Sequence, residues 1–284
     1  MSKFRILSID GGGALGCGPI SFMRSMQKTI PYKEDMLGGT SVGGLIVALR
    51  LAGRDWYEIE EIFMRGVGKI FEKPPLWWRM NPLKPRYRRD GLVDACKAEL
   101  GNRRCRDAPV PFVVPVYDFK EGRPKIVDET DDLTLAEMVL RTTAAPTYFA
   151  PIQSRWADGG VFANNPSMLA LGRVRRDFDI PMESIYILSL NTAGSFWKDP
   201  KVGDNMTKLS WIEPLIKSQL DGNEEIAEYQ CETFLGDRHF RVVPNLTGKV
   251  EIDDLSVLED YAYEWHITFM DHELELQRWE GVKP

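Results

Sequence analysis

Short apolar runs and helical patterns alternate along most of the chain. The runs 4–9, 111–119 and 184–191 are rich in apolar residues, which predicts buried strands, and 124–127 predicts a hairpin partner for the second run. Because strands that alternate with helices form parallel sheets, we predict an α/β fold, with helices on both faces of a mostly parallel sheet. The stretches that predict helices are about 17–29, 55–71, 92–100, 133–141 and 166–176.

The last part of the chain is more helical than the rest. Leu258, Ala262, Trp265 and Phe269 follow the i, i+4, i+7, i+11 spacing of a helix that packs one face against a core. Neither an internal repeat nor a low-complexity linker interrupts the sequence. We therefore expect one domain over 1–284, with its motifs in about 4–195 and a helical part over 196–284.

Composition is that of an ordinary globular protein. The chain has 284 residues, 43% of them hydrophobic and 27% charged, and its net charge of −6 argues against general affinity for nucleic acid. We see no signal peptide and no stretch near the roughly 18 apolar residues of a membrane span. The spacing of the cysteines fits free thiols in a reducing cytosol better than zinc or disulfides, so we expect a cytoplasmic protein. These cysteines are Cys17, Cys96, Cys105 and Cys231.

The segment 73–89 departs from this balance. It holds six basic residues, four prolines and no acid, and the prolines predict a loop rather than a helix. Tryptophans beside arginines suit a lipid–water interface, where indoles lie among headgroups and cations meet anionic lipid. An equally compatible alternative is a loop that buries its tryptophans in the core. The candidate membrane-contact residues are Trp77, Trp78, Arg79, Arg86, Arg88 and Arg89.

A G-x-S-x-G motif lies at 39–43, between a short apolar run and an apolar segment that ends in Gly53. This context is typical of a nucleophile elbow, a strained strand-to-helix turn that exposes a serine hydroxyl, here that of Ser41, above a sheet. The helix that follows would direct its free N–H groups and positive dipole end at the reacting oxygen. The alternative is a glycine-rich turn whose serine caps a helix.

A second glycine loop, Asp10-Gly11-Gly12-Gly13, follows the first predicted strand. It has neither the dinucleotide-binding pattern nor a Walker A pattern, so a nucleotide site is poorly supported. Three successive glycines allow consecutive backbone N–H groups to converge on one negative charge. An oxyanion hole requires such an arrangement.

A serine hydroxyl needs a base to take its proton. The three histidines, His239, His266 and His272, lie in strand-like or helical patterns, where structural roles are more common. Asp158 precedes two glycines, in a loop where a carboxylate can be directed at a neighbour. A carboxylate can act as the base within roughly 3 Å of the hydroxyl. Taken alone, an ordinary Asp-Gly turn explains this feature equally simply.

Together these motifs resemble the patatin-like phospholipases. The resemblance rests on 10–13, on 39–44, on 158–166 and on the preceding segment 143–149, and it covers about 4–195. It implies a three-layer α/β fold with a nucleophile elbow, and hydrolysis of lipid acyl esters without a metal ion or cofactor.

The resemblance also implies roles for individual residues. Ser41 and Asp158 would form a catalytic dyad of nucleophile and base. The backbone amides of Gly11, Gly12 and Gly13 would form the oxyanion hole, and we expect the amide of Val42, the residue after the nucleophile, to join them. One position departs from the family: Leu15 stands where the glycine loop usually carries arginine or lysine. Backbone donors survive that change, but cationic help to the oxyanion or a headgroup does not.

The expected activity is that of a lipid acyl hydrolase of the phospholipase A type, acting through an acyl-serine at a membrane surface. One alternative keeps the dyad in an acyltransferase or thioesterase, and another is a membrane-surface binding module with vestigial catalysis. The expected partners are a phospholipid or other acyl lipid and a peripheral membrane surface, without nucleic acid. The sequence predicts no oligomeric state.

Overall fold

The described part of the computed structural model comprises residues 2–81, 83–192, 203, 206–207, 210–244 and 250–282, and it contains one seven-stranded sheet. The strand order is β4-β3-β2-β1-β6-β7, with β5 paired to β3. The pairs β1–β2, β1–β6, β2–β3 and β6–β7 are parallel, whereas β4 and β5 run antiparallel to β3. The strands are β1 (Phe4–Ile9), β2 (Met36–Gly39), β3 (Phe112–Asp118), β4 (Arg123–Val127), β5 (Trp156–Asp158), β6 (Ile185–Leu190) and β7 (His239–Val242).

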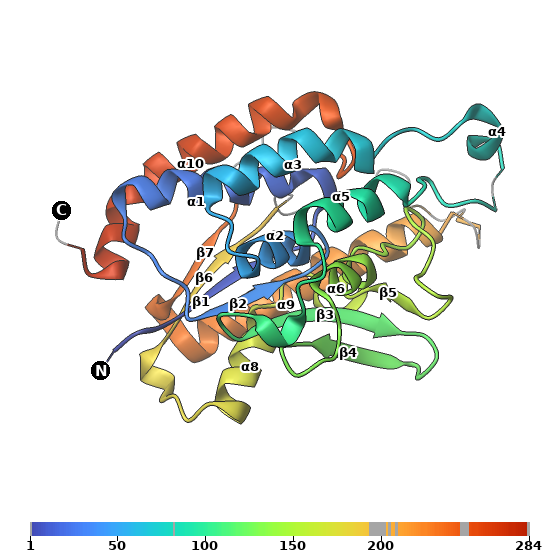
Figure 1. Ribbon diagram of the computed structural model, residues 1–284. Coiled ribbons are helices and arrows are strands. Elements are labelled where there is room, and N and C mark those ends of the chain that lie inside the picture. Colours follow the sequence, from blue (N-terminus) through green and yellow to red (C-terminus); the bar gives the residue numbers. More distant parts are fainter. Residues whose placement is uncertain are drawn as a thin grey trace.

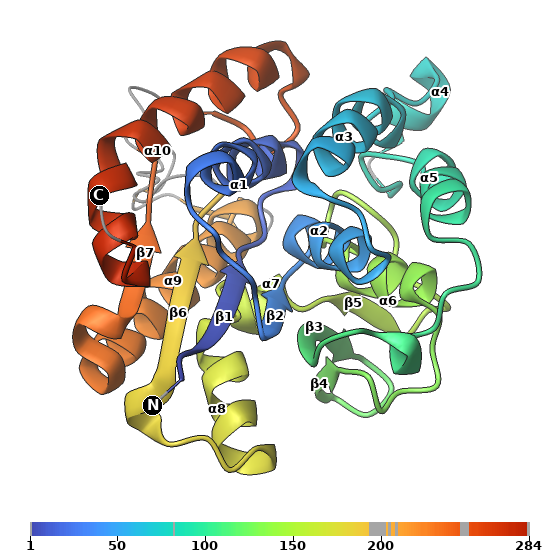
Figure 2. The same cartoon turned by 60° about the vertical axis from the view of Figure 1, so that its left-hand side comes forward.

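Helices cover both faces of the sheet, as Figure 1 and Figure 2 show together. The first face carries α1, α2, α3, α5 and α10, and the second carries α8 and α9. The helices are α1 (Cys17–Thr29), α2 (Val42–Leu51), α3 (Trp56–Ile70), α4 (Leu76–Arg79), α5 (Asp90–Leu100), α6 (Leu135–Thr142), α7 (Gly160–Ala163), α8 (Ser167–Asp177), α9 (Ile212–Leu235) and α10 (Leu258–Glu280).

Side chains alternate between the two faces along the central strands. Leu7 and Leu37 pack with the helices of the first face, whereas their neighbours Ile6 and Met36 pack with α8 and α9. Each strand is therefore buried on both sides, which is why these runs are almost continuously apolar. The predicted α/β fold class, with a mostly parallel sheet between two helical layers, is confirmed.

Local signals explain where helices begin and how they pack. Asp55 caps the start of α3. Its side chain accepts a hydrogen bond from the Glu58 amide, and the Glu58 side chain accepts one from the Asp55 amide, which completes a capping box. Trp265 and Phe269, from the predicted apolar stripe of α10, are buried and contact Phe22 of α1 edge to face.

Short elements lie where only loops were predicted. The segment 73–89 contains one helical turn, α4, which starts after Pro75 because proline fits the beginning of a helix. The region around Asp158, predicted as a loop, contains both β5 and α7. In the carboxy-terminal part, the strand-like pattern around His239 forms β7, which joins the sheet beside β6.

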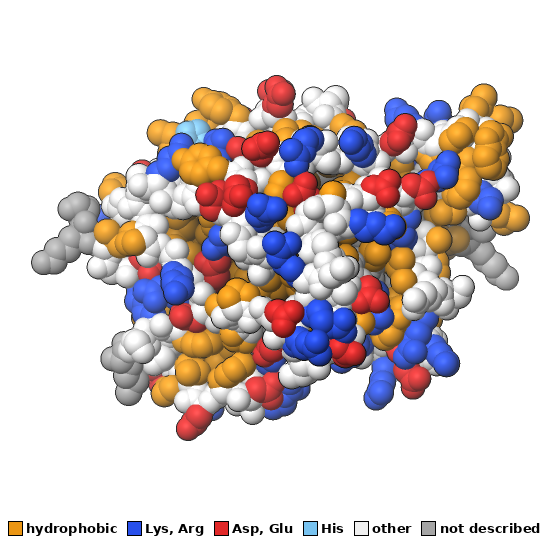
Figure 3. Space-filling view, viewed as in Figure 1, with side chains coloured by type: hydrophobic (Ala, Val, Ile, Leu, Met, Phe, Trp, Pro, Cys, Tyr) orange, Lys and Arg blue, Asp and Glu red, His pale blue; other side chains and the backbone are white. Residues whose placement is uncertain are grey.

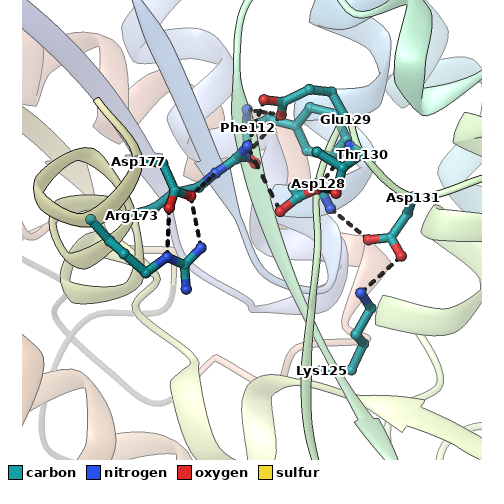
Figure 4. A network of polar contacts seen from close by, with 9 residues as sticks. Phe112, Lys125, Asp128, Glu129, Thr130, Asp131, Arg173 and Asp177 are labelled. Carbon is teal, nitrogen blue, oxygen red and sulfur yellow. Dashed lines mark hydrogen bonds and ion pairs between the residues drawn. The ribbon is translucent and has the colours of Figure 1, made fainter. Parts of the chain in front are cut away.

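The buried guanidinium of Arg173 joins α8, on the second face of the sheet, to the segment that follows β4 (Figure 4). Arg173 of α8 donates to the Phe112 carbonyl and to both carboxylate oxygens of Glu129, and it lies 3.7 Å from Asp128. Its side chain is only 6% exposed, so these acids compensate a charge that would otherwise be costly to bury.

The structure also bears on the cysteines, on membrane-spanning helices and on metal sites. The four cysteines are free and buried, as their spacing predicts. Within the described ranges, no helix has the length and apolarity to cross a bilayer. The described residues also hold no group of three His, Cys, Asp or Glu side chains that could bind a metal ion.

Candidate active site

β2 ends in a strained turn at Ser41. This residue has φ 55° and ψ −118°, a region that residues with a side chain rarely adopt, and α2 begins at the next residue. Its amide donates to the Thr142 hydroxyl at 3.0 Å, and that hydroxyl donates to the Pro115 carbonyl at 2.9 Å. The turn is therefore the nucleophile elbow predicted from the G-x-S-x-G spacing.

Both glycines of that motif lie where there is no room for a side chain. A Cβ on Gly39 would lie 2.4 Å from the carbonyl oxygen of Gly43, and a Cβ on Gly43 would lie 2.2 Å from that of Ile9. Because both distances are far shorter than a normal contact, any side chain here would push α2 away from β1 and open the turn.

β5 brings Asp158 to the same point of the sheet. β2 pairs with β3 only as far as Gly38 opposite Val113. Since β4 occupies the other edge of β3, β5 continues along the edge that β2 leaves, and it pairs Asp158 with Val116. The carboxylate therefore arrives just beyond the end of β2, where Ser41 turns out of the sheet.

The Ser41 side chain lies beside the Asp158 carboxylate and stabilises its ionised form. The carboxylate also accepts the Gly160 amide at 2.8 Å, and Asp158 is only 3% exposed. Burial raises the pKa of Asp158 to about 6, while the Ser41 side chain, the Gly160 amide and the charge of Arg89 act in the opposite direction. Such a carboxylate is mostly ionised at neutral pH and is a stronger base than a free aspartate.

The three histidines contact residues other than Ser41. His266 Nδ1 lies 2.9 Å from the Ser25 hydroxyl, and His272 Nδ1 lies 2.8 Å from the carbonyl of Thr268. His239 is buried in β7, where desolvation lowers its pKa to about 4. Among the described residues none of these imidazoles contacts the nucleophile elbow, so the titratable group beside the serine is a carboxylate.

The glycine loop lies against the elbow. A Cβ on Gly11 would be 3.2 Å from the Cβ of Ser41. The amides of Gly12, Gly13 and Val42 donate to no acceptor in the described part of the chain, so they are free to bind a substrate oxygen.

Gly13 itself requires the absence of a side chain. It has φ 59°, and the carbonyl of Ile252 lies 2.4 Å from the place where its Cβ would be. That carbonyl accepts the amide of Ala14 at 2.7 Å, so the loop around Ile252 fixes the end of the glycine loop.

Gly11 differs from its predicted role. Its amide donates to the Asn164 carbonyl at 3.2 Å, and its own carbonyl accepts from the Asn164 side chain at 3.3 Å. The amide is therefore already engaged, and the candidate oxyanion donors that remain are Gly12, Gly13 and Val42. Leu15, the departure from the family pattern, is fully buried in the core of the first face.

The segment 73–89 has an exposed tip, which we call the α4 tip. Its four apolar side chains are 65% to 91% exposed, and Figure 3 shows hydrophobic atoms gathered there beside lysine and arginine. The sequence alternative that buries both tryptophans is therefore wrong for Trp77, while Trp78 is half-buried and donates to the Pro85 carbonyl at 2.8 Å. The apolar residues of the α4 tip are Leu76, Trp77, Met80 and Leu83.

The candidate membrane arginines divide in the structure. Arg79 is exposed beside the α4 tip. Arg86 lies 3.0 Å from Asp253, and Arg88 lies 2.5 Å from Asp90, so an acid partly neutralises each of them. The sequence did not identify Leu76, Met80 and Leu83 as candidate membrane contacts, but all three are exposed at the α4 tip.

Arg89 does not belong to that surface. It is half-buried, donates to the Leu140 carbonyl at 3.1 Å and to that of Ala150, and stacks on Phe149. Burial lowers its pKa to about 10, and its charge acts on Asp158. The prediction of Arg89 as a membrane contact is therefore wrong, because its guanidinium is turned inward.

Comparison with protein families decides the class of this site. Residues 7–171, more than half of the chain, match the family described as patatin-like phospholipase. The chain belongs to the patatin-like phospholipase family. The matched residues include the glycine loop, Ser41 and Asp158, whereas α9, β7 and α10 lie beyond the matched region.

Curated relatives agree with this assignment. A cGAMP-activated phospholipase of Escherichia coli is 32% identical over 225 residues, which cover 68% of this chain and 63% of the relative. A cGAMP-activated phospholipase of Vibrio cholerae is 31% identical, with 68% and 65% covered. Patatin-like protein 2 of Arabidopsis thaliana is 30% identical, with 67% and 57% covered. The chain thus spans less than two thirds of the length of these patatin-like relatives.

Solved structures show the same fold. The crystal structure of VipD from Legionella pneumophila aligns with a TM-score of 0.50 at 13% identity, covering 95% of this chain and 67% of that chain. At such low identity the likeness concerns the patatin-like fold alone.

Proposed function

We propose that this protein hydrolyses fatty-acyl esters of phospholipids through an acyl-serine intermediate, with Ser41 as nucleophile and Asp158 as base. The observation that carries the proposal is the Ser41 side chain, presented by a strained turn, beside a buried carboxylate whose pKa is raised to about 6. Membership of the patatin-like phospholipase family supports an acyl lipid as the substrate.

The proposed reaction has two halves. The Ser41 oxygen attacks the ester carbonyl while Asp158 accepts the hydroxyl proton. The oxyanion then binds the amides of Gly12, Gly13 and Val42, each worth roughly 3–4 kcal/mol in comparable sites. Asp158 returns the proton to the leaving alcohol as the ester C–O bond breaks, which leaves an acyl-serine. It then takes a proton from a water molecule whose oxygen attacks the acyl-serine carbonyl, and it gives that proton to the Ser41 oxygen as the bond to the acyl group breaks and the fatty acid leaves.

The α4 tip extends the proposal to a membrane surface. Four exposed apolar side chains at one end of the molecule would bury area in the acyl–headgroup boundary, and nearby cations would meet anionic lipid. Lys73, Arg79 and Lys84 supply that charge from the same segment, which contains no acid. We therefore propose a peripheral membrane protein that docks through the α4 tip.

Mass spectrometry of products from mixed phospholipid vesicles tests the proposed reaction. We expect free fatty acid and lysophospholipid from the native chain and neither from Ser41→Ala, with the two proteins equally folded by circular dichroism. Since two relatives are described as cGAMP-activated, the assay is run with and without cGAMP. Acyl glycerol in the presence of glycerol would favour an acyltransferase, and turnover by Ser41→Ala would contradict the proposal.

A further inference from the structure

α9 lies outside the family match, yet it holds α7, the short helix that follows Asp158. The Asn223 side chain accepts the Asn164 amide at 2.5 Å and donates to the Gly160 carbonyl at 2.9 Å. The neighbouring Glu224 accepts from the Asn164 side chain through one oxygen. Two adjacent residues of α9 therefore fix both ends of the short helix α7, which follows Asp158.

Asn164 passes this support to the glycine loop. It is only 5% exposed, and it exchanges two hydrogen bonds with Gly11. Gly12 and Gly13 follow directly, and they carry two of the free amides. A path of hydrogen bonds therefore runs from Glu224 through Asn164 to Gly11, the residue that precedes the candidate oxyanion donors Gly12 and Gly13.

Glu224 also belongs to a buried charged cluster. Its other oxygen accepts from Asn191 at 2.8 Å and lies 3.9 Å from Arg241 of β7. Arg241 bonds to Asp10 at 2.6 Å and lies 3.6 Å from Glu228. One arginine thus faces three acids, and the first of them, Asp10, immediately precedes the glycine loop.

The charge balance of this cluster favours a proton on Glu224. Burial raises the pKa of Glu224 to about 8, and the negative charges of Asp10 and Asp221 act in the same direction, whereas Arg241 opposes them. Glu228 of the same helix and Tyr261 of α10 also face the cluster. Near neutral pH the acid is therefore mostly neutral, and a further negative charge appears behind the glycine loop only as the pH rises above about 8.

We propose that Glu224, with Asn223, is a positioning residue for catalysis: it fixes Asn164 and thereby holds the Gly12 and Gly13 amides where the oxyanion forms. This inference rests on the ester hydrolysis proposed above. It assigns to α9, which carries none of the recognised motifs, control over the geometry of the reacting centre.

Kinetics on a water-soluble p-nitrophenyl ester tests the proposal without a membrane. Glu224→Ala should lower kcat by roughly 10- to 100-fold with little change in KM. Misplaced amides stabilise the oxyanion of the transition state less well, whereas they contribute little to binding of the substrate. Glu225→Ala, the same change at the next, exposed position, is the matched control and should stay within about twofold. A Glu224→Ala enzyme with the kcat of this control, or with a change in KM alone, would overturn the proposal.

The pH profile separates positioning from simple loss of packing. The native enzyme should lose activity above about pH 8, as Glu224 ionises. Glu224→Gln cannot ionise, so its profile should lack that alkaline decline. An unchanged decline in Glu224→Gln would overturn the role of this side chain in setting the charge behind the loop.

Hydrogen exchange gives a readout that does not depend on turnover. Peptides covering 10–16 should exchange faster in Glu224→Ala and in the milder Asn223→Ala, and at the native rate in Glu225→Ala. If the native chain hydrolyses no ester, the proposed function fails, while exchange still judges the positioning. Native exchange over 10–16 in both α9 variants would overturn it.

Discussion

The candidate active site and the α4 tip are built in opposite ways. In the candidate site the backbone of Ser41 is strained, the Asp158 carboxylate is 3% exposed, and Gly39 and Gly43 leave no room for a side chain. At the α4 tip four apolar side chains point outward, up to 91% exposed at Leu83. The first region depends on fixed distances, whereas the second offers area and charge.

This contrast predicts how the two regions respond to substitution. Transition-state stabilisation falls steeply when a group moves by a fraction of an ångström, because it depends on aligned hydrogen bonds. Adsorption to a lipid surface adds small contributions from each buried side chain. A soluble ester reports on the centre alone, and a vesicle substrate reports on both regions.

The largest effect is expected from Asp158→Asn. The amide keeps the shape but cannot accept the hydroxyl proton, so kcat/KM on soluble and vesicle esters should fall roughly 10²–10⁴-fold. Since burial disfavours the charge of this acid in the folded state, the variant should also melt a few degrees higher at pH 8, roughly 2–4 °C. Calorimetry and steady-state kinetics measure both changes, and native activity would show that another group is the base.

A similar loss is expected from Gly13→Ala. The new methyl group meets the Ile252 carbonyl and forces a backbone with φ 59°, so it displaces a free amide at the cost of roughly 10²-fold in kcat. Gly66→Ala of α3, where nothing lies within 4 Å of the new Cβ, is the control and should leave kcat unchanged. Equal rates for the two variants would remove Gly13 from the oxyanion hole.

A smaller effect is expected from pH. Asp158 must be ionised to act as base, and its pKa is raised to about 6. The activity on a soluble ester should therefore be constant near pH 7 and should fall about tenfold for each pH unit below 6. A profile that stays flat down to pH 4 would contradict an Asp158 base.

The smallest effect is expected at the α4 tip. Leu76→Ser should weaken binding to anionic vesicles by roughly five- to tenfold, because it removes one apolar side chain from the lipid contact. Leu274→Ser of α10, with 60% exposure against 65%, is the matched control. Both variants should hydrolyse the soluble ester at the native rate, and vesicle sedimentation measures the difference. Equal vesicle binding by both would place the membrane contact elsewhere.

The arrangement of the candidate active site was largely predictable from the sequence because its residues lie in short motifs. Gly39 to Gly43 specify a turn through space and strain, and an aspartate before two glycines marks the end of β5. The engagement of the Gly11 amide by Asn164 was not predictable, since that bond joins two loops far apart in the chain. Periodicity identifies buried faces but not which loops meet.

The surface and the supports were less predictable. Arg89 shares a basic run with Arg86 and Arg88, yet only its side chain turns inward, since carbonyls of Leu140 and Ala150 receive it. Glu224 lies in no recognised motif. Its contact with Asn164 follows from the packing of α9 against α7, which the sequence pattern does not predict. The division into one domain over 1–284 stays a prediction.

Covalent labelling tests the central claim most directly. A fluorophosphonate reacts with an activated serine, and peptide mapping identifies the modified residue. The account predicts one adduct, on Ser41, with a labelling rate that rises with pH around a midpoint of about 6 and that falls at least 100-fold in Asp158→Asn. An adduct on another residue, or labelling of Ser41 at the native rate in Asp158→Asn, would contradict the Ser41–Asp158 dyad.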